Sequence, residues 1–67
     1  MKITLNKREE QIDKEMMTVQ ELIEHKNFSF KMLVTKVNGK LVKRDQRERA
    51  VIRDGDDVTV LHLVSGG

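Results

Sequence analysis

The sequence predicts a small α+β domain, in which a mixed β-sheet carries one main helix on one of its faces. Three observations support this fold class. Alternating apolar and polar residues open the chain, as in a strand with one buried face. A helix start signal follows at residues 18–21, and several short strand-like runs separated by turn residues fill the second half. The chain has 67 residues, which is room for a single domain.

The first predicted element is a strand over residues 1–6, with Ile3 and Leu5 on the same face. Residues 7–10 are all charged and predict a polar turn. Residues 11–14 then predict a weak second strand, in which Ile12 is the one strongly apolar residue. Together these segments predict a hairpin at the start of the chain.

The clearest local signal is a capping box at Thr18–Glu21, followed by a helix to about Lys26. The Thr18 hydroxyl can accept from the Glu21 amide while the Glu21 carboxylate accepts from the Thr18 amide. Met17 and Leu22 occupy the positions of a hydrophobic staple around this cap. After the helix, Asn27 can adopt the left-handed conformation that ends helices and can turn Phe28 back onto the apolar face.

The second half predicts strands that are separated by turn residues. Asn38-Gly39 is the strongest two-residue hairpin signal in the chain. The predicted order is a strand at 33–37, the Asn38-Gly39 turn, a short strand at 41–42, a charged connection with about one helical turn at 44–50, a short run at 51–52, a tight turn at 54–57 and a last strand at 58–64.

The last predicted strand is apolar on both faces, which is typical of a central strand. Val58, Val60 and Val64 lie on one face, and Leu61 and Leu63 lie on the other. A single helix can cover only one face of a sheet. The second face therefore needs either a long loop or a partner protein as its cover, and the sequence leaves both open.

The end of the sequence predicts a thin peptide arm. We expect the folded domain to span residues 1–64 and a flexible arm to span Ser65, Gly66 and Gly67. Three extended residues reach roughly 10 Å, and glycine passes through channels that are too narrow for other residues. The arm could present the Gly67 carboxylate to another protein's active site. The alternative is that Gly66-Gly67 is an unremarkable frayed end.

Composition excludes several functional classes. Without cysteine the chain has no disulfide framework, thiol nucleophile or Cys-based zinc site. Its apolar runs are too short to cross a membrane, and it has no signal peptide pattern, which together predict a soluble cytoplasmic protein. Basic residues concentrate between Lys40 and Arg53, but the chain has no Tyr or Trp. This composition favours an acidic protein partner over nucleic acid.

The side chains that could carry chemistry do not form a recognisable site. His25 and His62 lack a third ligand at suitable spacing, so we expect no metal. The aspartates at 54, 56 and 57 lack the calcium-loop pattern and are better explained by turn formation. Ser65 has no general base placed by any motif, so it is interpreted as a spacer.

The order of these elements resembles that of the ubiquitin-like sulfur carrier proteins, which have the β-grasp fold. The resemblance rests on Asn38-Gly39, Arg44, Asp54-Gly55-Asp56 and terminal Gly66-Gly67, and the layout is most similar to the ThiS family of thiamine biosynthesis. It spans essentially the whole chain. The poor second strand and the highly charged segment 44–53 depart from the family pattern.

The resemblance implies a protein co-substrate, not an enzyme. An E1-like, ThiF-type partner would use ATP and Mg to adenylate the Gly67 carboxylate, a sulfur donor protein would supply sulfur, and a ThiG-type thiazole synthase would receive it from the thiocarboxylate. The carrier itself would bind no cofactor. Ser65, Gly66, Leu61 and Leu63 would contact the partner, with Val58 and Val60 under the helix and basic residues guiding approach. A molybdopterin-pathway carrier, a ubiquitin-like modifier and a passive β-grasp interaction module remain as alternatives.

Overall fold

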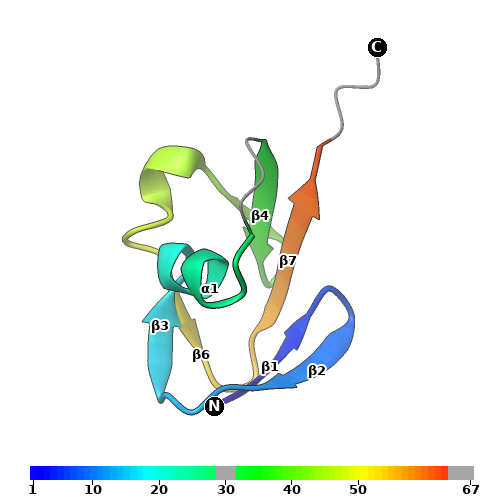
Figure 1. Cartoon of the computed structure of the whole chain (residues 1–67), viewed down its shortest axis with the longest axis vertical. Helices are drawn as coiled ribbons and strands as arrows, with labels where there is room; N and C mark the ends of the chain where they lie inside the picture. Colours follow the sequence, from blue (N-terminus) through cyan, green and yellow to red (C-terminus); the bar gives the residue numbers. More distant parts are fainter. Residues whose placement is uncertain (29–31, 64–67) are drawn as a thin grey trace.

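A computed structural model of the chain describes residues 1–28 and 32–63. Its main sheet has five strands in the order β2-β1-β7-β4-β5, and β7 lies at the centre (Figure 1). The first and last strands, β1 and β7, run parallel, while the other neighbours are antiparallel, so the sheet is mixed as predicted. The strand bounds are β1 Lys2–Leu5, β2 Arg8–Gln11, β4 Leu33–Val37, β5 Lys40–Val42 and β7 Asp57–His62.

The first hairpin differs from the prediction in its register. The chain turns at Asn6 and Lys7, and β2 begins at Arg8, inside the segment predicted to be the turn. Both turn residues have positive φ, at 51° and 67°, as a two-residue hairpin turn with primed geometry requires. The turn contains no glycine, so its sequence lacks the usual signal. Ile12 follows β2 and is buried in the core.

A second, two-stranded sheet was not predicted. It pairs β3 (Met16–Thr18) with β6 (Val51–Arg53), antiparallel. Each strand has three residues, too few to establish an alternating pattern in sequence. Between β5 and β6 the predicted helical turn is a short 3₁₀ helix, η1 (Arg44–Gln46).

The capping box forms as predicted and starts helix α1 (Val19–His25). The Glu21 amide donates to the Thr18 hydroxyl at 3.1 Å, and the Thr18 amide donates to the Glu21 carboxylate at 2.8 Å. Connection 47–50 satisfies two more helix donors: the amides of Val19 and Gln20 donate to backbone carbonyls there. Asn27 has φ 56°, which confirms the predicted left-handed residue after the helix.

The charged form of Glu21 contributes to the pH dependence of folding. The backbone hydrogen bond from Thr18 lowers the pKa of Glu21 below its ordinary value of 4.5. Because the folded-state pKa lies below the unfolded one, this contribution is present at neutral pH and is lost as the pH falls through the folded pKa. We expect Glu21→Gln to be less stable than wild type at neutral pH, with the gap narrowing at an acidic pH, as the pH falls through the folded-state pKa. Urea midpoints of both proteins at the two pH values test this, and an unchanged gap would contradict it.

The core lies between α1 and one face of the main sheet. The helix contributes Val19, Leu22 and Ile23, and the central strand β7 contributes Val58 and Val60. Met17 before the cap is also buried, in agreement with the predicted staple. The complete buried cluster is Ile3, Leu5, Ile12, Met17, Val19, Leu22, Ile23, Val42, Ile52, Val58 and Val60.

Two asparagine side chains hold β7 where neighbouring strands turn away from it. Asn6 replaces a missing strand neighbour, since its Nδ2 donates to the Val60 carbonyl at 3.1 Å and its Oδ1 accepts from the Val60 amide at 2.8 Å. Asn38 accepts from the Asp57 amide at 2.9 Å. Both asparagines have φ near 51° and so combine a left-handed turn with a strand contact. The predicted Asn38-Gly39 hairpin turn is confirmed.

We expect Asn6→Gly to lower the free energy of unfolding by about 1–3 kcal/mol, because it leaves the Val60 amide and carbonyl without their side-chain partner. Glycine tolerates positive φ, so the backbone conformation of the turn is preserved and the loss reports mainly the hydrogen bonds. Urea unfolding measures the effect. Lys7→Gly is the matched control, because it introduces glycine at the other left-handed position of the same turn; an equal loss in both variants would contradict the proposed role of the amide.

Candidate functional site

The two faces of β7 have opposite environments. Val58 and Val60 are 0% and 5% exposed, whereas Leu61 and Leu63 are 50% and 47% exposed. The valines therefore lie under the helix, as the resemblance implied, and the leucines lie on the face that α1 does not cover. β7 runs over Asp57–His62, so it begins one residue before the predicted strand, and the predicted end at Val64 lies outside the described residues.

Neighbouring strands add apolar side chains to the surface of Leu61 and Leu63. Val34 pairs directly with Leu61, and the Leu63 amide donates to the Met32 carbonyl at 3.0 Å. On β5, Leu41 alternates with buried Val42 and so lies on the same face as Val34 and Leu61. We call this surface the apolar patch: Met32, Val34, Leu41, Leu61 and Leu63.

The sequence predicted only the β7 members of this patch. Met32 and Leu41 are more than half exposed, at 55% and 57%. Their positions beside Leu61 follow from the register of β4 against β5 and β7, which a single sequence does not give. The alternation of Leu41 with Val42 was the available signal. Contiguous exposed apolar surface of this kind is typical of protein interaction sites.

The described part of the chain ends beside the apolar patch. Leu63 belongs to the patch and is also the last described residue before the predicted arm. Ser65, Gly66 and Gly67 lie outside the described residues, so their predicted roles and the division at residue 64 remain predictions. The apolar patch therefore adjoins the last described residue of the chain.

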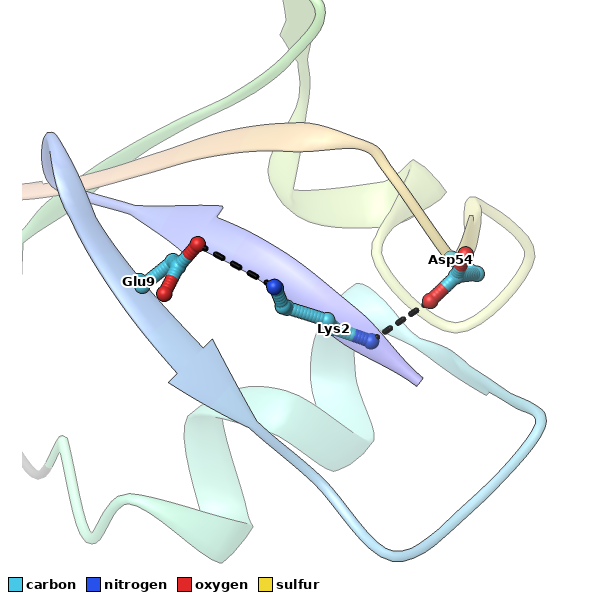
Figure 2. Close-up of polar contacts among 3 residues, drawn as sticks. All are labelled: Lys2, Glu9 and Asp54. Atoms are coloured by element: carbon cyan, nitrogen blue, oxygen red, sulfur yellow. Dashed lines mark hydrogen bonds and ion pairs between the residues drawn. The ribbon is translucent and has the colours of Figure 1, made fainter.

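The aspartates near residue 55 support turns, as predicted. Asp54 accepts from the Lys2 amide at 2.7 Å, which ties this turn to β1 (Figure 2). Asp56 accepts from the Arg53 amide at 2.8 Å and from the Asn38 side chain at 3.1 Å. Gly55 between them has φ 87°, a conformation that favours glycine.

The two histidines lie on different elements, His25 at the end of α1 and His62 at the end of β7. Within residues 1–28 and 32–63, no three His, Cys, Asp or Glu side chains are grouped so that they could hold a metal ion. The same part of the chain contains no helix long and apolar enough to cross a membrane.

The fold is that of the ubiquitin-like β-grasp proteins. Its mixed sheet packs on one α-helix, its last strand is central, and the sequence after that strand ends in Gly66-Gly67. The ThiS family model matches residues 2–67, and the chain therefore belongs to the ThiS family of small sulfur carrier proteins in thiamine biosynthesis.

Solved structures agree with this assignment. The crystal structure of a thiamine biosynthesis protein (ThiS) from Geobacter metallireducens has a TM-score of 0.90, with 26% sequence identity and full coverage of both chains. An NMR structure of a thiamine biosynthesis protein from the same organism has a TM-score of 0.82 at 26% identity, covering all of this chain and 88% of the other. No curated protein matches the sequence at a significant level.

Proposed function

We propose that this protein carries sulfur for thiazole synthesis as a thiocarboxylate on Gly67. The observation that carries the proposal is the family match over residues 2–67, which extends through Gly66-Gly67 and so covers the end that we propose to be reactive. The position of the apolar patch at the exit of β7 supports it, because a partner enzyme can hold the domain there while the arm enters its active site.

The chemistry requires activation because a free carboxylate is a poor acyl donor. In the proposed first step, a Gly67 carboxylate oxygen attacks the α-phosphorus of ATP, with Mg held by the partner, and pyrophosphate leaves. The product is an acyl-adenylate with AMP as a good leaving group. A sulfur donor at the oxidation level of sulfide then attacks the acyl carbon and expels AMP, which leaves the thiocarboxylate.

The carrier contributes no catalytic side chain in this scheme. Its contributions are the arm of Ser65, Gly66 and Gly67, the terminal carboxylate, and a docking surface that includes Leu61 and Leu63. The proposed partners are an E1-like, ThiF-type adenylating enzyme, a sulfur donor protein and a ThiG-type thiazole synthase, all acting in the cytoplasm. ATP and Mg belong to the adenylating partner and not to the carrier.

The deciding experiment is an intact-mass measurement after the carrier is incubated with ATP, Mg, a ThiF-type enzyme and a sulfur source. We expect the mass change for exchange of one carboxylate oxygen for sulfur, located at Gly67 by fragmentation. Omission of ATP is the control and should leave the mass unchanged. A lysine-linked conjugate as the main product would instead identify a ubiquitin-like modifier.

A further inference from the structure

A basic hollow borders the apolar patch near the end of β7. It has a volume of about 330 Å³, and its lining includes Met32, Leu41 and Leu63 on the apolar side and Lys43, Arg44 and Arg47 on the charged side. The sequence showed a diffuse run of basic residues between Lys40 and Arg53. In the structure three of them, Lys43, Arg44 and Arg47, line one concave surface together with the exposed side chains of Leu41 and Leu63.

The position of Arg47 is fixed without neutralising its charge. Its Nη2 donates to the Leu33 carbonyl at 2.6 Å and its Nε to the Thr35 hydroxyl at 3.3 Å, and both acceptors are uncharged. Thr35 is fully buried and donates in turn to the Val42 carbonyl at 2.7 Å. The guanidinium is therefore held by the sheet while its positive charge remains available to an anion.

The other two cations of the hollow, Lys43 and Arg44, also have no ion-pair partner within residues 1–28 and 32–63. The ion pairs found within residues 1–28 and 32–63 are Lys2–Glu9 at 3.3 Å and Lys26–Glu10 at 2.6 Å, and both involve β2 on the far side of the sheet. Figure 2 shows the first of these pairs across β1 and β2. Asp45 and Glu48, although close in sequence, make no ion pair with Lys43 or Arg44 among the described residues. Lys43, Arg44 and Arg47 thus form a group of cations that have no ion-pair partner among the described residues.

Three cations beside three exposed apolar side chains suit a ligand that is both acidic and apolar. The volume is at the low end of the roughly 300–1,000 Å³ typical of small-molecule pockets, which favours one or two side chains over a bound cofactor. Nucleic acid fits less well, because base stacking needs exposed aromatics. The chain has no Tyr or Trp; of its two phenylalanines, Phe28 packs against the core and Phe30 lies outside the described residues.

We propose that the basic hollow is a docking subsite for a partner-protein segment with an apolar side chain flanked by carboxylates. The apolar side chain would pack against Leu41 and Leu63, and the carboxylates would face Lys43, Arg44 and Arg47. This inference rests on the proposed function in one respect, that the partner carrying the segment is the adenylating enzyme. The binding chemistry itself is independent of ATP and sulfur.

The test is an NMR titration of ¹⁵N-labelled full-length protein with a blocked hexapeptide of alternating glutamate and leucine. We expect chemical-shift changes centred on residues 41–47 and 63, and weaker binding as salt is added. The same peptide with lysine in place of glutamate should bind at least tenfold more weakly. Equal binding of the two peptides, or shifts centred elsewhere, would overturn the proposal.

Charge variants locate the effect. Lys43→Glu/Arg44→Glu should reduce affinity for the glutamate peptide at least tenfold. The domain should stay folded, because within the described residues the hydrogen bonds of Lys43 and Arg44 use their backbone atoms and not their side chains. Lys7→Glu/Arg8→Glu is the matched control, since it makes the same change in net charge at the β1–β2 turn and should bind nearly as wild type. If the reversed pair does not give a folded spectrum, the single changes Lys43→Ala and Arg44→Ala replace it.

The outcomes separate this inference from the proposed function. An equal loss in both double variants would show that net charge, and not the hollow, attracts the peptide, which would overturn the proposal. Tighter binding of an oligothymidylate of equal charge would assign the hollow to nucleic acid instead. Peptide binding without thiocarboxylate formation would leave the subsite in place and contradict the carrier function, and the reverse result would do the opposite.

Discussion

Removal of Gly66 and Gly67 is expected to abolish acyl-adenylate and thiocarboxylate formation while the domain stays as stable as the full chain. The truncated chain still ends in a carboxylate, on Ser65, but that group would lie two residues short of the position proposed for the Gly67 carboxylate. Stability should be preserved because the predicted arm would make few contacts with the fold, and the buried cluster found among residues 1–28 and 32–63 lies between Ile3 and Val60. Intact mass after reaction with ATP, a ThiF-type enzyme and a sulfur source measures the first effect, and urea unfolding measures the second.

One added residue after Gly67 is the sharper form of the same experiment. It keeps both glycines and a terminal carboxylate but displaces the reactive carbon, which must lie within about 3–3.5 Å of its attacking or activating partner. We expect loss of product as complete as in the truncation. Gly67→Ala keeps the length and should be milder, through a clash in the partner's channel. Undiminished thiocarboxylate in the extended protein would exclude the carrier mechanism.

Local sequence signals predicted the parts of the fold that depend on local chemistry. The capping box at Thr18–Glu21 located the start of α1 within one residue, and Asn27 located its end equally well. Asn38-Gly39 located the second hairpin turn. The two apolar faces of the last strand correctly indicated a central position for β7. Each of these signals is a pattern of contiguous residues whose physical cause acts over one turn or one strand.

The features that the sequence missed depend on contacts between distant segments. Met17 pairs with Ile52 in the small sheet, but the two three-residue strands are too short to show an alternation of apolar and polar residues. The turn at Asn6–Lys7 has no glycine signal in the sequence, and Asn6 is held there by hydrogen bonds to Val60, which is distant in sequence. In the sequence, Arg47 is one of several basic residues between Lys40 and Arg53. The structure distinguishes it from the others, because its guanidinium donates to the carbonyl of Leu33. These three features depend on strand register and on hydrogen bonds between distant segments, which a single sequence does not specify.

Adjacent positions on β7 should separate docking from folding. We expect Leu61→Asp to leave the domain folded and to weaken adenylation by roughly thirtyfold or more, because an exposed apolar anchor at an interface is typically worth about 2 kcal/mol or more. Val60→Asp, one residue away, should unfold the protein. Its side chain is 5% exposed, and a buried unpaired carboxylate costs several kcal/mol.

The pair is informative because both variants place the same charge on the same strand, so strand propensity and net charge are matched. Circular dichroism and urea unfolding report the fold, and the rate of ATP-dependent adenylation by a ThiF-type enzyme reports docking. Because a small domain has only about 5–15 kcal/mol of stability, the Val60 variant has little reserve. An unfolded Leu61→Asp protein would place Leu61 in the core, and a folded one with normal adenylation would remove the apolar patch from the docking surface.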